Sequence, residues 1–324
     1  MSRHIWLVGA GSMAIDYIKV LKALNVSFNV IGRGMKSANE CESKTGSKVI
    51  VGGLARCLCD CEQPPSSAIV AVNVEELANV TKTLLRAGVK KILVEKPGGL
   101  NANEICSVAE DTIKQDAEVY IAYNRRFYSS TRKAQQIIKD DGGVTSFYFE
   151  FTEWSHQIAN INKAPEVKEN WLLANSSHVI DLAFFLGGTP KKISCYKAGG
   201  LDWHQSGSIY AGAGVAESGA LFSYQANWEA PGRWAVEVLT KKHRLILKPL
   251  EELYIQKIGS MATELMKCNG QIDVDFKPGL FLQTDLFLSN QYGRLLTIDA
   301  QCSNLNIYNK IIHGKETENI AGSK

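Results

Sequence analysis

Long apolar runs are missing from this chain of 324 residues. A helix that crosses a bilayer needs about 20 consecutive apolar residues, and Gly, Asp or Lys interrupts every stretch that approaches this length. Near the N-terminus, Asp16 and Lys19 break up the one segment that resembles a signal peptide. We therefore expect a cytoplasmic protein.

An excess of charge of either sign is also missing. The formal net charge is +3, with 36 Lys and Arg residues against 33 Asp and Glu. The basic residues form no block, and aromatic residues do not alternate with them along a face. Because nucleic acids and anionic membranes attract such patterns, we expect neither as a partner.

Cysteine occurs at eight positions, without the spacing of a common metal site. Cys57, Cys59 and Cys61 form a C-x-C-x-C pattern, which on an extended segment would point alternate thiols together. Zinc sites use other spacings. We predict no metal and, in the absence of a secretory context, a set of free thiols.

The most informative feature that is present is a glycine turn near the N-terminus, between an apolar run at 5–8 and a helical pattern of apolar residues. A strand, a glycine turn and a helix in this order bring backbone N–H groups and the positive end of a helix to one point. This arrangement suits a pyrophosphate and predicts a nicotinamide dinucleotide site. The residues of the turn that we assign to this site are Gly9, Gly11, Ser12, Met13 and Ala14.

The first part of the chain alternates strand and helix patterns up to about residue 122. Strands are expected at 5–8, 28–31, 68–72, 91–94 and 118–122, and helices at 13–24, 36–45, 75–87 and 103–115. Such alternation predicts a Rossmann-type, doubly wound parallel sheet, with its ligand outside the carboxyl ends of the strands. We assign 1–123 to a dinucleotide-binding domain of the α/β class.

The second part is rich in strands. Strands are expected at 144–154, 191–197, 218–228, 234–240 and 244–247, and helices at 128–139, 169–186 and 280–288. This pattern predicts an α+β domain over 124–324 with a large, mainly antiparallel open sheet for substrate binding and oligomerisation.

One face of that open sheet should be covered by helices and the other by a second subunit. Leu221, Phe222, Val236 and Leu239 are the apolar side chains that we expect on the uncovered face. We therefore predict a homodimer or homotetramer with symmetric contact between sheets.

Two positions carry candidate proton-transfer chemistry. Lys96 emerges from the end of the strand at 91–94 beside Pro97, from where its amine could donate to a substrate oxygen; a surface lysine on a turn is the alternative. His178 lies in the helix expected at 169–186, with Asp181 one turn beyond it. A histidine oriented by an acid or amide suits reversible proton transfer at a carbinol, and a buried structural histidine is the alternative.

These motifs together resemble a known family. The glycine turn, the motif Glu95-Lys96-Pro97, the stretch Tyr123-Asn124-Arg125-Arg126-Phe127 and the segment His178-Val179-Ile180-Asp181 occur in the order found in Gfo/Idh/MocA oxidoreductases. The matches extend over the first 190 residues. The resemblance implies an NAD(P)-dependent dehydrogenase or reductase that acts on a secondary alcohol or ketone of a sugar, cyclitol or nucleotide sugar.

The resemblance also implies roles for individual residues. Lys96 would bond the reacting oxygen, and His178 would act as the acid or base. Members of the family commonly carry an aspartate four residues before this histidine, where the present chain has Ala174. Asp181 or Lys96 would then have to support the proton transfer, or His178 is not the sole base.

The cofactor type depends on the residues after the second strand. An acidic residue there would favour NAD, whereas this chain has Arg33, with Ser37 soon after. A guanidinium can pair with a 2′-phosphate, so NADP(H) is favoured over NAD(H), although Arg33 could instead stack on the adenine. Further residues assigned to the cofactor site are Asn73, Glu95, Lys96 and Pro97.

The substrate site is predicted from aromatic and hydrogen-bonding residues, which suit a carbohydrate. Its assigned residues are Asn124, Arg125, Trp154, Trp171, Asn175 and His178, with Arg126, His156, Trp203, His204 and Lys277 as further candidates. Two other functions remain open. A protein of this architecture can be a non-catalytic, dinucleotide-binding regulator, which the alanine at 174 favours, or it can reduce a linear tetrapyrrole, which the polar candidates disfavour.

Overall fold

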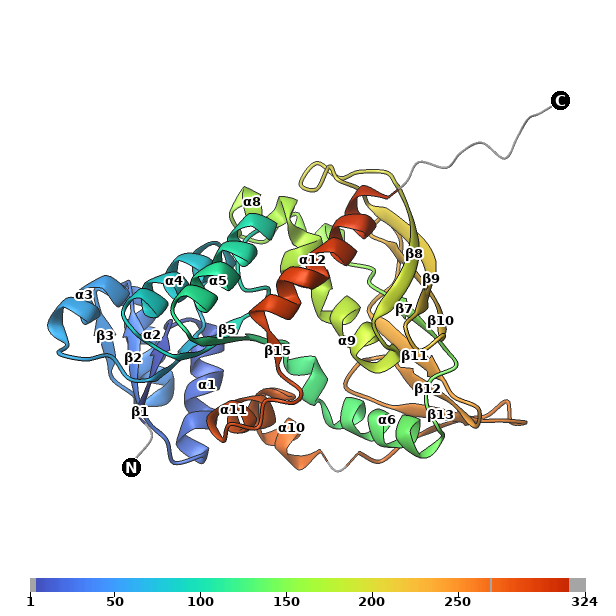
Figure 1. Cartoon of the computed structure of the whole chain (residues 1–324), viewed down its shortest axis with the longest axis horizontal. Helices are drawn as coiled ribbons and strands as arrows, with labels where there is room; N and C mark the ends of the chain where they lie inside the picture. The colour runs from blue at the N-terminus through green and yellow to red at the C-terminus, as the bar shows by residue number, and fades with distance from the viewer. Residues whose placement is uncertain (1–3, 269, 315–324) are drawn as a thin grey trace. The chain divides into compact units, whose positions relative to one another are not determined.

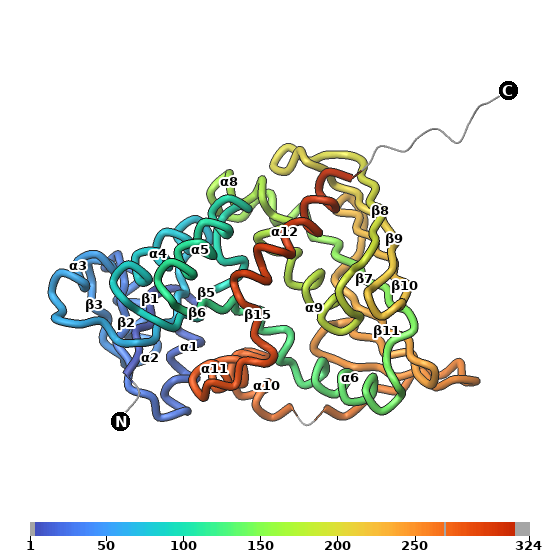
Figure 2. Tube along the Cα trace, in the orientation of Figure 1, coloured from blue at the N-terminus to red at the C-terminus, as the bar shows by residue number. Residues whose placement is uncertain are grey.

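The computed structural model describes residues 4–268 and 270–314, which form two compact units (Figures 1 and 2). The first unit takes in the chain up to Phe127 together with Gly270–Leu305. The second unit takes in 128–268 and 306–314. The sequence-based division placed everything after residue 123 in one domain, whereas the segment Gly270–Leu305 returns to the first unit.

The first unit is built on a seven-stranded sheet. Its strands are β1 (His4–Val8), β2 (Ser27–Gly32), β3 (Val49–Val51), β4 (Ser67–Val70), β5 (Lys91–Glu95), β6 (Glu118–Ala122) and β15 (Leu296–Thr297). The order is β15-β6-β5-β4-β1-β2-β3, and all neighbours are parallel except β15 against β6. The predicted Rossmann-type sheet is thus confirmed, and the chain switches direction across the sheet between β1 and β4.

Helices cover both faces of this sheet, as right-handed crossovers require. The helical segments of this unit are α1 (Ser12–Ala23), α2 (Met35–Thr45), α3 (Gly53–Asp60), α4 (Leu77–Arg86), α5 (Ala102–Lys114), α10 (Gln271–Asp275), α11 (Leu280–Leu288) and the first part of α12 (Ile298–His313), with short turns η1 (Val74–Glu76) and η2 (Asn124–Phe127). Helices α1 and α2 pack side by side, as do α4 and α5. The returning helix α11 packs on α1 and buries Leu280 and Phe287 in the same core.

The segment after β2 differs from the prediction. β3 and α3 were missed, because β3 has only three residues and α3 starts at a pair of glycines. The C-x-C-x-C pattern therefore lies on and just after a helix and not on an extended segment: Cys57 is buried, Cys59 exposed and Cys61 half-buried. Among the described residues, no three His, Cys, Asp or Glu side chains are grouped so that they could hold a metal ion.

The second unit contains an eight-stranded sheet in the order β14-β13-β12-β11-β7-β10-β9-β8. Its strands are β7 (Ser146–Glu150), β8 (Pro190–Ala198), β9 (Ile209–Ala216), β10 (Leu221–Asn227), β11 (Ala235–Leu239), β12 (His243–Leu247), β13 (Tyr254–Lys257) and β14 (Thr263–Leu265). Every pair is antiparallel except β7 with β10. The predicted large, mainly antiparallel sheet is confirmed.

Helical segments of the second unit are α6 (Ser129–Asp140), α7 (Ser155–Ile158), α8 (Pro165–Glu169), η3 (Leu172–Ser176) and α9 (Ser177–Gly187). The helix expected at 169–186 forms from Trp171 to Gly187 but is irregular, because α8 ends at Glu169 and η3 is a π-helical turn. Helix α9 packs on β7 and β11. The regular spacing of Trp171, Asn175 and His178 along one helix is therefore not kept.

The face of the sheet turned toward α9 carries two of the residues expected on the open face. Phe222 and Val236 are buried, and the ring of Phe222 lies 5.3 Å from that of Phe184 on α9. Residue alternation explains the error: neighbours along a strand face opposite ways, so Leu221 is 60% exposed while Phe222 is not. In the described ranges, no helix is both long enough and apolar enough to span a bilayer.

Candidate functional site

The turn between β1 and α1 requires glycine at its first position. Gly9 has a φ of +129°, and a Cβ built there would lie 2.2 Å from the carbonyl oxygen of Ala71, directly after β4. Any side chain would therefore clash with the neighbouring backbone. A Cβ at Gly11 would instead meet nothing within 4 Å, so the space in front of the second glycine is open.

Helix α1 begins directly after this turn. Its N-cap residue is Gly11, and no side chain caps the helix. The backbone N–H groups of Ser12 and Met13 therefore lack the intrahelical partners that later residues have. Ala14 is fully buried, which lets α1 lie close to the sheet. Open amides at a helix N-terminus, at the β1/β4 switch point, fit the pyrophosphate of a dinucleotide.

Lys277 lies beside the same turn, on the segment that returns to the first unit. Its Nζ is 2.8 Å from the Sδ of Met13 and 3.7 Å from a carboxylate oxygen of Asp16, both on α1. Lys277 also has an electrostatic interaction with Glu95 at the end of β5. Sequence reasoning left open whether this lysine only starts a helix; the structure brings its amine to the first turns of α1.

Arg33 follows β2 and is paired with an acid. Its Nη1 donates to Oε1 of Glu76 at 2.9 Å, although the arginine side chain is 77% exposed. The hydroxyl of Ser37, in the first turn of α2, donates to the carbonyl of Gly34 at 3.1 Å. Asn73 is exposed after β4 and donates to Glu75 at 3.1 Å. Any group that binds Arg33 therefore has to compete with the carboxylate of Glu76.

Glu95, the last residue of β5, is hydrogen-bonded inside the first unit. The hydroxyl of Tyr17 donates to it at 2.9 Å, and Gln283 donates to that hydroxyl at 3.2 Å. Burial is the main cause that raises the pKa of Glu95 and the pKa of Tyr17 above their ordinary values. The acid of the predicted motif is thus part of the packing between β5, α1 and α11.

Lys96 is half-buried at the tip of β5 and is followed by the buried Pro97. The buried side chain of Gln301, on α12, donates to the carbonyl oxygen of Pro97 at 3.1 Å and to the hydroxyl of Tyr123 at 3.0 Å. Sequence analysis did not find Gln301, because it lies 204 residues after Pro97. The backbone next to Lys96 is therefore held by the returning segment.

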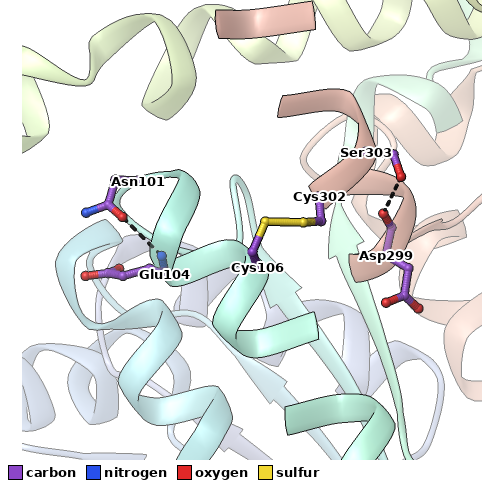
Figure 3. Close-up of a disulfide and its surroundings, with 6 residues drawn as sticks. All are labelled: Asn101, Glu104, Cys106, Asp299, Cys302 and Ser303. Carbon is purple, nitrogen blue, oxygen red and sulfur yellow. Dashed lines mark hydrogen bonds between the residues drawn. A yellow bond between two sulfur atoms is a disulfide. The ribbon is translucent and has the colours of Figure 1, made fainter. Parts of the chain in front are cut away.

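A disulfide lies one residue further along α12. Cys302 is bonded to Cys106 of α5, with Cα atoms 5.4 Å apart (Figure 3). Asn101 caps the start of α5 by accepting from the N–H of Glu104 at 3.1 Å. The expectation of free thiols is wrong for this pair. It failed because 196 residues separate the two cysteines, and no local pattern marks them as partners.

The residues after β6 hold the returning segment. Asn124 is buried and donates to the carbonyl of Pro278 at 2.9 Å, and Arg126 donates to the carbonyl of Arg294 at 3.3 Å. Arg125 between them is half-buried. These contacts give Asn124 and Arg126 a structural role in the first unit, whereas a contact of Asn124 or Arg125 with substrate stays a prediction.

In the second unit, the predicted residue Asn175 contacts a buried acid that sequence analysis missed. The side chain of Glu153, three residues after β7, is 1% exposed. Its Oε1 accepts from Asn175 at 3.0 Å and from Ser176 at 2.7 Å, and Oε2 accepts from Arg233 at 3.2 Å. The sequence did contain a signal for this acid, because Glu153 stands at the end of an apolar strand pattern. An acid that is buried there requires partners.

His178 and Asp181 are both buried on α9, directly after Asn175 and Ser176, which donate to Glu153. The ring of His178 lies 6.2 Å from that of Trp234. The guanidinium carbon of Arg233 lies 4.5 Å from the ring of Trp234 and 4.6 Å from that of Trp154. Arg233 and Trp234 were not predicted as site residues, since they lie just before β11, where the sequence indicated only a strand at 234–240.

The remaining aromatic candidates divide into core and surface. Trp171 packs edge-on against the half-buried Trp203, with ring centroids 6.1 Å apart. His204 is buried and hydrogen-bonded to the carbonyl of Gly207 at 2.8 Å, and burial lowers the pKa of its imidazole. His156 is exposed on α7. His204 thus has the environment of a structural core histidine.

Comparisons with known proteins identify relatives by structure. No family model and no curated protein matches the sequence. An oxidoreductase from Agrobacterium radiobacter, solved with NAD+, L-tartaric acid and magnesium, has a TM-score of 0.75 at 11% identity, over 96% of this chain and 95% of that one. Levoglucosan dehydrogenase, in complex with NADH and levoglucosan, has a TM-score of 0.73 at 16% identity, over 95% and 96%.

A nucleotide-sugar enzyme shares the fold as well. The WlbA dehydrogenase from Bordetella pertussis, in complex with NADH and UDP-GlcNAcA, has a TM-score of 0.71 at 13% identity, over 96% of this chain and 95% of that one. Identities this low show the fold alone. The present chain has the fold of NAD-binding oxidoreductases.

Proposed function

We propose that the protein is a nicotinamide-dependent oxidoreductase of the Gfo/Idh/MocA type. It transfers a hydride between the cofactor and a secondary alcohol or ketone of a sugar, cyclitol or nucleotide sugar. The observation that carries this proposal is the open glycine turn at the β1/β4 switch point, with Lys96 at the tip of β5. The proteins of the same fold that were solved with levoglucosan and UDP-GlcNAcA support a carbohydrate substrate.

Three residues carry the proposed chemistry. When bound, the nicotinamide supplies or accepts the hydride. Lys96 donates to the reacting oxygen and stabilises the negative charge that develops on it. His178 takes up the hydroxyl proton during oxidation and returns it during reduction. Asp181, buried three residues further along α9, supports the protonated imidazole.

The test is turnover of NADH and NADPH with a panel of keto-sugars, free and nucleotide-linked. We expect Lys96→Met and His178→Asn each to lower kcat by about 100- to 10,000-fold, the range that acid–base groups supply. Binding of the dinucleotide, followed by its fluorescence, should change much less. Lys114→Met, at an exposed position of α5, is the control. A chain that binds dinucleotide but turns over no substrate would be the regulator considered above.

We further propose that NADP(H) is favoured over NAD(H), with Arg33 as the residue that pairs with the 2′-phosphate. Glu76 competes for this guanidinium. The variant Glu76→Gln should therefore raise the affinity for NADPH about fivefold, the worth of one charge-assisted hydrogen bond at an exposed site, without changing that for NADH. Arg33→Ala should remove the preference. Equal affinities of the unaltered chain for both cofactors would contradict the role of Arg33.

A homodimer or homotetramer is proposed from the uncovered face of the second sheet. Leu221 and Tyr196 are exposed on β10 and β8, and small residues such as Ala213 lie between them on β9. This row is exposed and partly apolar, which suits contact with a second copy. Light scattering at micromolar concentration should report more than one subunit, and Leu221→Glu should shift the protein toward the monomer.

A further inference from the structure

Glu153 is a buried carboxylate with hydrogen bonds to residues that lie next to His178 or its aromatic neighbour. It lies in the segment that follows β7, and its side chain is almost completely excluded from solvent. It accepts from Asn175 and Ser176, which directly precede α9, and from Arg233. A buried charge is costly unless it is paired and hydrogen-bonded, so this group is held in one place by its partners.

The two partners before α9 belong to an unusual piece of backbone. Asn175 and Ser176 are the last residues of the π-helical turn η3, and His178 is the second residue of α9. A π-turn inserts an extra residue and changes the direction in which the following side chains point. Because Glu153 accepts from both residues, its carboxylate fixes the turn that sets the direction of His178.

Arg233 connects the same carboxylate to the aromatic neighbour of His178. Its guanidinium donates to Glu153 and lies over the ring of Trp234, which is the ring next to His178. A cation over the face of an aromatic ring is attracted by it, so Arg233 and Trp234 are held together. Glu153 is therefore linked to the surroundings of His178 through η3 and through the pair Arg233 and Trp234.

We propose that Glu153 is the positioning residue of His178. It holds η3 and Trp234 in place around the imidazole, and its negative charge favours the protonated form that arises when His178 takes up a proton. This inference rests on the proposed function for His178. At position 174 the chain has alanine, so η3 itself brings no carboxylate to this place. Asp181 is also buried on α9, three residues after His178, and Arg233 carries a positive charge beside Trp234.

The decisive variant is Glu153→Gln, which keeps the shape and removes the charge. We expect kcat to fall about 100-fold, a large part of what a proton-transfer group supplies, while KM and dinucleotide affinity stay within about twofold. In histidine-labelled protein, the NMR titration midpoint of His178 should fall by about one pH unit, because an opposite charge nearby is lost. Glu150→Gln is the matched control, since Glu150 lies on β7 and pairs with Lys248.

Rescue separates positioning from general loss of structure. The double variant Glu153→Gln with Ala174→Asp places a carboxylate on η3 and should recover at least tenfold of the lost kcat. If Glu153→Gln does not fold, Arg233→Met leaves the carboxylate present and should raise the titration midpoint of His178. Unchanged kcat and an unchanged His178 titration in folded Glu153→Gln would overturn the proposal.

The two proposals fail in different ways. If the unaltered chain turns over no substrate, the proposed function fails, whereas the titration of His178 still tests the role of Glu153 without any substrate. If the unaltered chain is active and Glu153→Gln behaves like Glu150→Gln, the proposed function stands and the positioning role is wrong.

Discussion

Acidic residues of similar burial have different environments in this chain. Glu95 accepts from a tyrosine hydroxyl, and burial raises its pKa, whereas Glu153 has an arginine and two further donors. The charges of Lys96 and Lys277 lower the pKa of Glu95 but do not outweigh burial. Arg233, by contrast, forms a direct ion pair with Glu153. Each acid therefore has to be judged from its own partners, which the sequence around it does not reveal.

Asp141 gives a prediction for stability against pH. Burial alone would raise the pKa of Asp141, but hydrogen bonds from His243 and Thr240 and the charge of Lys242 outweigh it and lower the pKa below its ordinary value. Its contribution is therefore present above about pH 4, the ordinary range of an aspartate, and is lost as the pH falls through the lower value in the folded state.

The variant Asp141→Asn should lose about 2 kcal/mol of unfolding free energy at pH 7, the worth of a charged hydrogen bond. The difference from the unaltered chain should shrink toward pH 3. Urea unfolding at pH 7, 5 and 3 measures it, with the adjacent exposed Asp140→Asn as the control. A deficit that stays constant over this range would contradict the role of the charge.

Lys277 gives a prediction for cofactor binding. Its amine lies near the first turns of α1, where the pyrophosphate is proposed to bind, so it adds a positive charge to that place. Because the side chain is 41% exposed, solvent screens this charge, and we expect Lys277→Met to weaken dinucleotide binding by only about five- to tenfold.

Fluorescence titration with NADH and NADPH measures this effect. Lys19→Met is the matched control, since Lys19 also approaches Asp16, at 4.0 Å, but from further along α1. Equal loss of affinity in both variants would mean that Asp16, freed from its partner, repels the cofactor, and Lys277 would have no contact of its own.

At the scale of elements, the sequence predicted those helices and strands that depend on interactions between residues close together in the chain. The β1–α1 unit follows from an apolar run, two glycines and a helical repeat, and α11 was expected at the residues where it forms. The π-turn η3 was not predictable, because the residues that stabilise it lie in another segment, at Glu153. The sequence around His178 therefore predicted a functional helix but not its irregular start.

Helix α12 gives a prediction at this scale. Gln301 donates to the backbone beside Lys96 and to Tyr123 inside the first unit. Gln301→Leu removes the donor to both acceptors, and we expect a loss of about 1–3 kcal/mol in stability. Turnover should fall about tenfold, because small displacements of a reacting group are costly.

Ser303→Ala, on the same helix, removes only an exposed hydrogen bond to Asp299 and is the control (Figure 3). Loss of stability with unchanged kcat would limit Gln301 to packing.

At the scale of the whole molecule, the chain's division depends on contacts between distant segments. Residues 270–305 return to the first unit because Leu280 and Phe287 complete the core beside α1, and because Asn124 donates to Pro278. The change in strand and helix pattern near residue 123 predicted a single domain boundary. A single boundary cannot describe a unit that is formed by two separate segments of the chain. The apolar repeat of α11 shows that it is buried, but not against which sheet.

The disulfide between Cys106 and Cys302 closes a long loop of the chain. It joins residues 196 apart, and such a crosslink restricts the unfolded chain, with a stabilisation of about 2–5 kcal/mol in the loop-entropy account. Cys302→Ser should lower the midpoint of denaturant unfolding accordingly, and reductant should lower that of the unaltered chain but not of the variant. Cys59→Ser, at an exposed thiol of α3, is the control.

Alkylation of the unaltered chain in denaturant should label two thiols fewer without reductant than with it. Equal labelling would show that α5 and α12 are held together by packing alone.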